Sequence, residues 1–509
     1  MTYPTTDRGT GSTQEQAGLA ANWFGSLTRR DLLGIGAAIG LMTALSVYQL
    51  GAKSFWRDEV ASVVFASASL PDLLTIVGRD REKAGVPNMA TYYLLLHFWL
   101  AIGETEARIR FLSVAASVAT VVPVFFLARR LGGTIAAASA ALLFAVSPYV
   151  LVWSREARGY SLAMLATAAL TWVLLVAVER RSILLSVIYG VIAALAVYVH
   201  FFVLLALVAH AAWVVLPRPR APLWLIGLAA LPIIVAIAPI PFIYGEHGGG
   251  HEWIPAFSLR GLVDTLATLA GGEGLLVVLS ALAATAFAAR RRDPVAWLVA
   301  MTALAPLALT IALVPAQNLL LARYLVIVIP LVAVLAGAGL VWVRPRSLRV
   351  VTAVGLALLL AVGLPSAYAD TRQQDWRGAA RWVAAGAQPG DVMAVRSFAL
   401  RPLEYYLDRF EIEHMPEITN LRTALEDETP GRMWVVLGGQ TQLELREIDE
   451  QLSDRYTITS KRRFGSKVMV WLLGPRTDDG TDDAAQGRRT MAGGLVAART
   501  STRGERESQ

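Results

Sequence analysis

The chain contains no cysteine and few charged residues. Only 17% of its 509 residues are Asp, Glu, Lys or Arg, against roughly a quarter in a soluble protein. The lack of Cys excludes disulfides, thiolate metal sites and cysteine nucleophiles, although it does not identify the cellular compartment. Hydrophobic residues make up 55% of the chain, and several apolar runs approach the ~20 residues that cross ~30 Å of hydrocarbon. These features predict a polytopic α-helical membrane protein.

The net charge of +7 does not indicate a nucleic-acid partner. Most arginines form short clusters between apolar runs, and such clusters set the orientation of membrane helices because they stay in the cytoplasm. The clusters are Arg29-Arg30, Arg129-Arg130, Arg180-Arg181, Arg218/Arg220, Arg290-Arg291-Arg292 and Arg344/Arg346/Arg349. Pairs of spans fit between successive clusters, which predicts an N-terminus inside the cytoplasm and a C-terminus outside it.

We expect about eleven transmembrane helices from the lengths of the apolar runs. They are 32–50, 108–128, 133–152, 160–178, 183–199, 201–217, 222–243, 274–289, 294–314, 324–342 and 348–366. The first lacks a small-residue cleavage site, so we interpret it as a retained span. An alternative with twelve spans would make 89–102 a crossing. That run is short, and a crossing there would put Arg129-Arg130 on the wrong side.

The loop 51–107 then lies wholly outside the cytoplasm. We expect 60–78 and 89–102 to be helices lying along the outer interface. In the first span, Gly34, Gly36 and Gly40 superficially resemble a dinucleotide-binding loop, but no strand precedes them. Close helix packing is the expected role of these glycines.

The C-terminal part has a different composition. We expect residues 1–27 to be a disordered tail, 28–369 the transmembrane domain, 370–476 a small α/β domain outside the cytoplasm, and 477–509 a second disordered tail. Within the α/β domain, helices are predicted at 376–385, 400–407 and 443–452, and strands at 391–395, 433–437, 456–461 and 467–473.

This topology places the unusual polar residues on the outer face. They are Arg57, Asp58, Glu59, Arg79, Lys83, Asn88, Arg155, Glu156, Arg158, Tyr160, Gln317, Asn318, Arg323 and Tyr324. Arginine is disfavoured on that side, so an anionic ligand is the expected reason for it. A carboxylate beside arginines and a bilayer favours group transfer from a lipid phosphate. The base would take a proton from an acceptor hydroxyl, and arginines would stabilise the departing phosphate.

Five motifs in register carry a resemblance to a known family. They are Phe55-Trp56-Arg57-Asp58-Glu59, Tyr92-Tyr93-Leu94-Leu95-Leu96-His97-Phe98-Trp99, Ala107-Arg108-Ile109-Arg110-Phe111, Ser154-Arg155-Glu156-Ala157-Arg158-Gly159-Tyr160 and Ala322-Arg323-Tyr324. Over about residues 30–370 the chain resembles the bacterial protein O-mannosyltransferase and aminoarabinose-transferase-like family. This is glycosyltransferase family 39 of the GT-C superfamily, whose members use polyprenyl-phosphate sugars.

The resemblance implies an inverting transferase with its site in an outer cavity under the first loop. It implies Asp58 as general base, with Glu59 beside it in the catalytic pair. Phosphate contacts would be Arg158, Tyr160 and Arg323, and sugar or acceptor contacts Glu59, Glu156, Asn88, Tyr92 and His97. One departure concerns the His-Pro-Pro or Lys-Pro-Pro that the family usually has before its Tyr-Tyr run. Asn88-Met89-Ala90-Thr91 stands there, and Lys83 is the substitute we consider.

Structural interpretations of the same residues stay open. Asp58 could be a solvated helix-end charge, and Arg158 and Arg323 could be ion-pair partners of Glu156 or Asp58. Tyr160 could be an interfacial anchor, and His97 and His200 could be hydrogen-bonded structural histidines. His247 and His251 flank a run of glycines that suits either a metal site or, as we prefer, a flexible lid.

The sequence therefore predicts a hexosyl- or pentosyltransferase of the bacterial plasma membrane. It would move one sugar from a polyprenyl-phosphate donor to an acceptor outside the cytoplasm, either a cell-envelope glycan, a lipid or a protein. No cofactor is expected, and a divalent metal is not expected either, because a phosphate monoester leaves without a general acid. Two other classes compete: a transporter or flippase of lipid-linked sugars, and a non-catalytic scaffold. The first usually shows internal repeats, and the second leaves the outer arginines unexplained.

Overall fold

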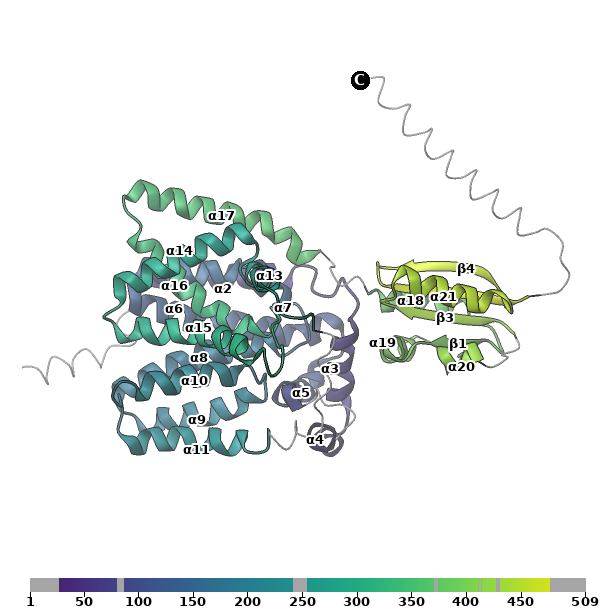
Figure 1. Ribbon diagram of the computed structural model, residues 1–509, viewed down its shortest axis with the longest axis horizontal. Helices are drawn as coiled ribbons and strands as arrows, with labels where there is room; N and C mark the ends of the chain where they lie inside the picture. The colour runs from purple at the N-terminus through teal and green to yellow at the C-terminus, as the bar shows by residue number, and fades with distance from the viewer. Residues whose placement is uncertain are drawn as a thin grey trace, which may run out of the picture. The chain divides into compact units, whose positions relative to one another are not determined.

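The computed structural model describes residues 27–79, 87–240, 254–369, 374–410, 412, 414–426 and 431–476. The chain divides into two compact units, one ending at Asp375 and the other beginning at Trp376. The first is helical and the second contains a β-sheet (Figure 1). Most of the two predicted disordered tails, residues 1–26 and 477–509, lies outside the described residues.

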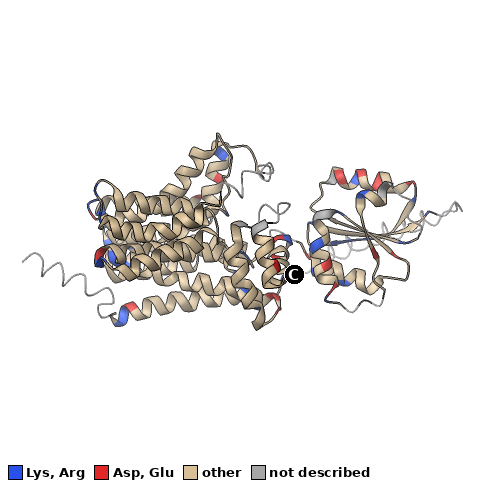
Figure 2. Ribbon diagram, turned by 90° about the horizontal axis from the view of Figure 1, so that it is seen from below, with Lys and Arg blue, Asp and Glu red and all other residues tan. Residues whose placement is uncertain are grey.

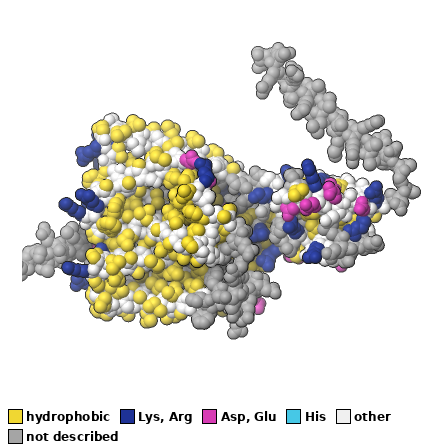
Figure 3. Space-filling model, in the orientation of Figure 1, with side chains coloured by type: hydrophobic (Ala, Val, Ile, Leu, Met, Phe, Trp, Pro, Cys, Tyr) yellow, Lys and Arg dark blue, Asp and Glu magenta, His cyan; other side chains and the backbone are white. Residues whose placement is uncertain are grey.

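The helical unit consists of long apolar helices and several short ones. The helices are α2 (Arg29–Val47), α3 (Arg57–Ser67), α4 (Leu70–Arg79), α5 (Ala90–Trp99), α6 (Glu106–Ala145), α7 (Pro148–Ser154), α8 (Tyr160–Arg180), α9 (Ile183–Val197), α10 (Val203–Val215), α11 (Leu223–Ile237), α13 (Leu259–Ala270), α14 (Glu273–Arg290), α15 (Pro294–Leu313), α16 (Ile329–Trp342) and α17 (Arg346–Tyr368). Short 3₁₀ turns, η2 to η4, occupy Pro87–Met89, Leu100–Ile102 and Leu325–Val328. Hydrophobic side chains cover much of the face seen in Figure 3.

The predicted fold class is confirmed. Seven of the described helices are long and apolar enough to cross a membrane: α2, α6, α8, α14, α15, η4 with α16, and α17. The shorter apolar helices α9, α10 and α11 coincide with three further predicted spans. The remaining span comes from α6, which corresponds to two predicted spans, 108–128 and 133–152.

The chain reverses within α6 at Gly133, whose φ of 74° and ψ of −165° are not helical. Glycine tolerates this positive φ because it has no Cβ. Hydrogen bonds to α2 show the reversal. Near the start of α6, Arg110 donates to Leu50, just beyond the end of α2. Shortly before Gly133, Arg129 donates to Asp31, near the start of α2. After Gly133, the chain returns to Ser154, which bonds Ser46 near the end of α2. The segments 106–132 and 134–145 are therefore antiparallel.

Basic clusters meet at one end of the helical unit, where Figure 2 shows Lys and Arg gathered. Arg129 pairs with Asp31 at 3.1 Å, and Arg130 lies 3.7 Å from both Glu179 and Asp293. Arg290 donates to the carbonyl oxygen of Leu131, the residue after the cluster Arg129-Arg130. The alternation predicted from the arginine clusters is thus present in the fold. Which side of the membrane this end faces stays a prediction.

The first loop forms helices at the opposite end of the unit. Thr91, just inside α5, bonds Tyr198 and Leu195 at the end of α9 through its amide and its hydroxyl. The prediction of one helix over 60–78 is wrong in one respect. The segment forms two helices, α3 and α4, with a break at Ala68 and Ser69. The helix predicted for 89–102 is α5 followed by a 3₁₀ turn.

The glycines of the first span do not all pack closely, so that prediction is only partly right. A Cβ on Gly34 would lie 2.9 Å from the Cβ of Ala138, but no described atom lies within 4 Å of one on Gly36 or Gly40. Tighter helix packing occurs in α16, where a Cβ on Gly339 would overlap the carbonyl oxygen of Leu282 in α14.

The second unit is a five-stranded sheet with the order β2-β1-β3-β5-β4. Its strands are β1 (Val392–Val395), β2 (Glu417–Asn420), β3 (Met433–Gly438), β4 (Tyr456–Phe464) and β5 (Val468–Pro475), and its helices are α18 (Trp376–Gly386), α19 (Ser397–Leu407), α20 (Leu421–Glu426) and α21 (Gln442–Ser453). β1 pairs in parallel with β2 and β3, whereas β5 is antiparallel to β3 and β4. Strand β2, with four residues, and helix α20, with six, were not predicted, because segments this short show little hydrophobic periodicity.

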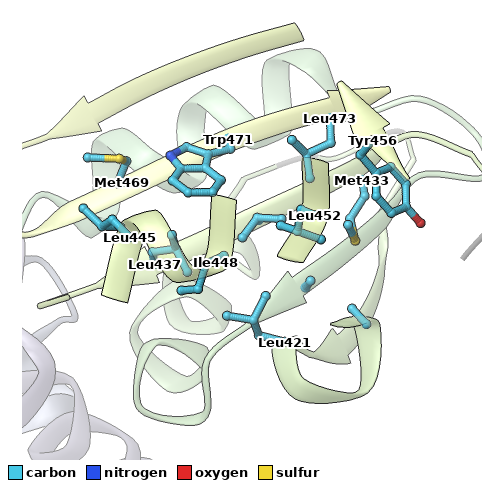
Figure 4. Close-up of a cluster of buried hydrophobic side chains, with 13 residues drawn as sticks. Leu421, Met433, Leu437, Leu445, Ile448, Leu452, Tyr456, Met469, Trp471 and Leu473 are labelled. Atoms are coloured by element: carbon cyan, nitrogen blue, oxygen red, sulfur yellow. The ribbon is translucent and has the colours of Figure 1, made fainter. Parts of the chain in front are cut away.

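The core of this unit joins the sheet to α21. Figure 4 shows Trp471 and Leu437 from the strands beside Ile448 and Leu452 from α21. A buried Asp391 fixes the start of β1, since it accepts hydrogen bonds from Arg432 at 2.8 and 3.0 Å and from Trp434 at 2.7 Å. The predicted α/β character of this region is confirmed.

We expect Gly339→Ala to destabilise the helical unit by about 1–3 kcal/mol or more, because the added methyl group forces α14 and α16 apart. Gly355→Ala is the control, since no described atom lies within 4 Å of a Cβ at that position in α17. It should be neutral or slightly stabilising. Melting temperatures of the purified protein in detergent measure both effects. Equal temperatures for the two variants would contradict the packing described here.

Candidate active site

The site begins at the first turn of α3, where Asp58 and Glu59 are the second and third residues of the helix. Carboxylates are favoured there because the amide groups of a helix start carry partial positive charge. The carboxylate of Glu59 turns back and accepts a hydrogen bond from the amide of Trp56 at 3.3 Å. Consecutive residues of a helix point in different directions, so the two acids enter different environments.

Glu59 is buried, with 1% of its surface exposed. Both of its oxygens accept from Arg110, at 2.8 and 2.7 Å, and one also accepts from the amide of Ala157 at 2.8 Å. With the bond from Trp56, four donors hold this carboxylate. A buried ion pair is stable only when its remaining hydrogen-bonding capacity is filled in this way. The geometry therefore favours Glu59 as a positioning residue over the predicted role in catalysis or sugar binding.

Arg110 connects the first loop to the bundle. Besides Glu59, its guanidinium donates to the carbonyl oxygens of Leu50, Lys53 and Ser54, at 2.9 to 3.1 Å. The arginine comes from the first half of α6, while these three carbonyls belong to the connection between α2 and α3. Arg110 thus sets the position of α3 relative to the membrane helices.

Asp58 faces a more open environment, with 23% of its side chain exposed. Its carbonyl oxygen accepts from Arg158 at 3.2 Å, and the same guanidinium nitrogen donates to Ser62 at 3.1 Å. Arg158 follows Ala157, so the Glu59 network also places this arginine. Burial opposes its charge, but Tyr93, Tyr160 and Asp58 outweigh that effect and raise the pKa of Arg158 above its usual value. The guanidinium stays charged.

Arg323 reaches the same region from the segment between α15 and η4. Burial opposes its charge as well, but Tyr160, Tyr324 and Asp58 together raise the pKa of Arg323. Asp58 is therefore close enough to act electrostatically on both Arg158 and Arg323. Three segments far apart in the sequence contribute to one charged site, at the end of the unit opposite the basic clusters.

Aromatic rings surround this site. Tyr160 is buried between Trp153, with ring centroids 4.1 Å apart, and His200, at 5.4 Å. His200 also lies 5.5 Å from the ring of Tyr324 and 5.6 Å from that of Phe202. Tyr160 belongs to this cluster and is not an exposed interfacial anchor.

A cavity of about 750 Å³ adjoins Arg323. It lies between α7, α13 and the start of α14, and its lining includes Trp153, Thr268 and Ser366. An apolar cavity of about 260 Å³ adjoins it, and its lining includes Leu143 of α6, Leu269 of α13 and Leu325 of η4. Helix α13 and the segment 321–325 contribute to both cavities, so the two are neighbours, and Arg323 lines the larger one.

Other predicted site residues lie elsewhere or serve the fold. Asn88 accepts from the amide of Phe201 at 2.8 Å, and His97 is hydrogen-bonded to the carbonyl oxygen of Ala66 at 2.8 Å. Tyr92 is buried, and Glu156 lines a separate cavity of about 60 Å³. The geometry favours structural roles for Asn88 and His97. Lys83 and the pair His247 and His251 lie outside the described residues.

Arg110 and His200 were not among the predicted site residues. Arg110 stands inside one of the five motifs, so its position signalled importance, but nothing in the sequence connects it to Glu59. His200 was interpreted as structural, because its relation to Arg158 and Arg323 appears only after α9 and α10 fold against the loops.

Comparisons with known proteins agree with this architecture. Residues 86–244 match the model of the dolichyl-phosphate-mannose-protein mannosyltransferase family. The fold is similar to crystal structures of ArnT from Cupriavidus metallidurans. The apo structure gives a TM-score of 0.56 at 13% identity, covering 89% of this chain and 98% of that one. The structure with undecaprenyl phosphate gives 0.55 at 14%, covering 87% and 97%. A comparison with curated proteins finds no match. The predicted resemblance to GT-C glycosyltransferases is confirmed.

Arg110→Met should destabilise the protein by about 3–5 kcal/mol, because it leaves the buried Glu59 carboxylate without a counter-charge. The double variant Glu59→Leu/Arg110→Met should recover part of the loss. Arg57→Met is the control: Arg57 lies 3.5 Å from Asp58 but is more than half exposed, so removing it should change stability by less than about 1 kcal/mol. Detergent melting temperatures test this, and equal losses for the two single variants would contradict it.

We expect the free energy of unfolding to depend on pH because of His200. Burial, together with Arg158 and Arg323, lowers its pKa from 6.5 to about 3, so between these values the unfolded chain binds one more proton than the folded protein. The free energy of unfolding then falls as pH is lowered below about 6.5, by up to about 1.4 kcal/mol per pH unit from this residue. The melting temperature of His200→Gln should therefore fall less than that of the wild type between about pH 7 and 5. Parallel decreases would contradict the assignment.

Proposed function

We propose that this protein is an inverting glycosyltransferase of the GT-C superfamily that takes a hexose or pentose from a polyprenyl-phosphate donor. The acceptor is a glycan, lipid or protein outside the cytoplasm, and the membrane is the bacterial plasma membrane. The observation that carries the proposal is that a partly exposed carboxylate, Asp58, acts electrostatically on two guanidinium groups, Arg158 and Arg323. Arg158 also donates to the carbonyl oxygen of Asp58, and Arg323 lines a cavity that adjoins an apolar one. The ArnT structure that binds undecaprenyl phosphate has the same fold.

Asp58 acts as the general base. Its carboxylate takes the proton of an acceptor hydroxyl group, and the acceptor oxygen attacks the anomeric carbon of the donor sugar. The bond from that carbon to the phosphate oxygen breaks, and the lipid monophosphate leaves with the electron pair. Attack from the face opposite the leaving group inverts the configuration. Glu59 holds the first turn of α3, so that Asp58 keeps its position.

Arg158 and Arg323 stabilise the leaving group. The donor is a phosphodiester with one negative charge, and the departing monoester approaches two, since its second pKa is near 6. Charged guanidinium donors in a site shielded from water stabilise this added charge more strongly than they stabilise the starting ester. No general acid is needed, and the step as written needs no metal.

The two cavities suit an amphiphilic donor. Arg323 lines the cavity of about 750 Å³, and Leu325, two residues further on, lines the apolar one. A phosphate at Arg323 would therefore place a prenyl chain near Leu269, Leu325 and their neighbours. Each buried CH₂ group contributes roughly 0.8 kcal/mol. Tyr160 is a further phosphate contact in this proposal, while Glu156 and Tyr92 remain proposed sugar contacts.

A transporter or flippase is the less favoured candidate. Such proteins bind their substrate at the middle of the membrane, where discontinuous helices meet. The charged site described here lies at one end of the helical unit, between α3 and the loop before α8. A carboxylate placed beside two arginines serves proton removal and charge stabilisation better than passage across the membrane.

Asp58→Asn should lower sugar transfer by about 10²–10⁴-fold, because an amide cannot accept the acceptor proton. Purified protein is incubated with membrane extract and a panel of radiolabelled polyprenyl-phosphate sugars, and release of polyprenyl phosphate is followed. Asp72→Asn is the control, since this exposed acid only caps α4 through Ser69. Transfer by the wild type and Asp72→Asn alone supports the enzyme. Equal translocation of label by all three proteins without cleavage would indicate a flippase.

A further inference from the structure

The turn between α9 and α10 carries a buried histidine that the reaction above does not use. His200 has 1% of its surface exposed. Its turn is held by the first loop, because Asn88 accepts from the amide of Phe201 and Thr91 donates to Tyr198 and Leu195. The imidazole is thus fixed by the same loop that carries Asp58.

The hydrogen bonds of His200 define its tautomer. The amide of Phe202 donates to Nδ1 at 3.3 Å, so Nδ1 carries a lone pair and the proton of the neutral ring is on Nε2. The ring stays neutral because burial, Arg158 and Arg323 lower its pKa to about 3. His200 therefore presents one N–H donor, at Nε2.

This donor has no acceptor among the described residues. Buried donors are nearly always paired, so an orphan one calls for an explanation. The nearby charged groups that act on His200 are Arg158 and Arg323, which are donors themselves. The Nε atom of Arg158 is also buried without an acceptor in the described part of the chain. Two buried donors, Nε2 of His200 and Nε of Arg158, thus lack an acceptor among the described residues, and an anion with several oxygens would supply one to each.

We propose that His200 binds the phosphoryl group of the lipid donor, with Nε2–H donating to a phosphate oxygen between Arg158 and Arg323. This assignment rests on the proposed function and adds a third phosphate ligand to it. A neutral donor strengthens its bond as the phosphate gains charge, but it adds no charge of its own. The charges of Arg158 and Arg323 already balance the two negative charges of the monoester product. A protonated His200 would add a third positive charge and slow the release of that product.

The chain offers a matched control in His210. This imidazole is equally buried, with 1% exposed, but both of its nitrogens are paired, with Thr171 at 3.1 Å and Tyr189 at 2.9 Å. It lies within α10, whereas His200 lies before that helix. If burial of an imidazole alone mattered, the two histidines would respond alike to substitution.

Binding of farnesyl phosphate and of farnesol to the full-length protein in detergent tests the proposal. His200→Phe should lower the affinity for farnesyl phosphate by about 10–100-fold, because it loses a hydrogen bond to a charged group. Its affinity for farnesol should equal that of the wild type. His200→Gln should stay within a few-fold of the wild type, because its amide nitrogen can donate from near the position of Nε2. His210→Phe should leave both affinities unchanged.

Two results would overturn different conclusions. If the wild type binds farnesyl phosphate more tightly than farnesol and His200→Phe does so equally, His200 is not a phosphate ligand, although the proposed function stands. If the wild type does not distinguish phosphate from alcohol, the proposed function itself fails.

A second measurement does not require the Phe variant to fold. Wild-type protein labelled with ¹⁵N-histidine has six histidines, and the loss of one signal in His200→Gln assigns His200. Farnesyl phosphate should shift the Nε2 proton resonance of His200 downfield, whereas farnesol should not. An unchanged resonance in the presence of saturating farnesyl phosphate would refute direct contact.

Discussion

A carboxylate cannot remain charged in apolar surroundings unless other groups compensate for the water that it has lost. Glu59 meets this requirement through Arg110 and two backbone amides, and the arrangement of the site follows from it. The amide of Ala157 brings the loop after α7 against α3, and the next residue is Arg158. The guanidinium of Arg110 holds the connection from α2. One buried ion pair thus brings three segments together and leaves the neighbouring acid, Asp58, at an open position beside Arg158.

Much of the fold could be predicted because a membrane restricts what a sequence can do. Apolar runs and arginine clusters located the spans, and the pairing of Arg130 with Glu179 and Asp293 agrees with the predicted alternation. Details that depend on a few residues were less accessible. The break between α3 and α4 at Ala68 and Ser69 has no strong sequence signal. The strand β2 is four residues long, and its pairing with β1 comes from the sheet and not from its own pattern.

The sequence predicted which distant motifs lie at the same end of the helical unit. Asp58, Arg158 and Arg323 come together as the topology requires. Roles within the motifs were harder to assign, because Asp58 and Glu59 are adjacent and chemically alike in the sequence. Only the fold shows that one is saturated by donors and the other is open. The same holds for His97 and His200: both are histidines near aromatic residues, yet one is hydrogen-bonded to a carbonyl oxygen, and the other has a buried Nε2 without a partner among the described residues.

Arg110 contacts the connection after α2 through the carbonyl oxygens of Leu50, Lys53 and Ser54 and not through their side chains. Every amino acid supplies such a carbonyl, so these three bonds restrict the length of the connection and not its composition, which its side-chain contacts to Tyr368, Gln374 and Arg110 restrict separately. One inserted or deleted residue would move all three oxygens out of register with a rigid guanidinium. Related chains should therefore keep the number of residues in this connection, because that number sets the distance between the end of α2 and Asp58.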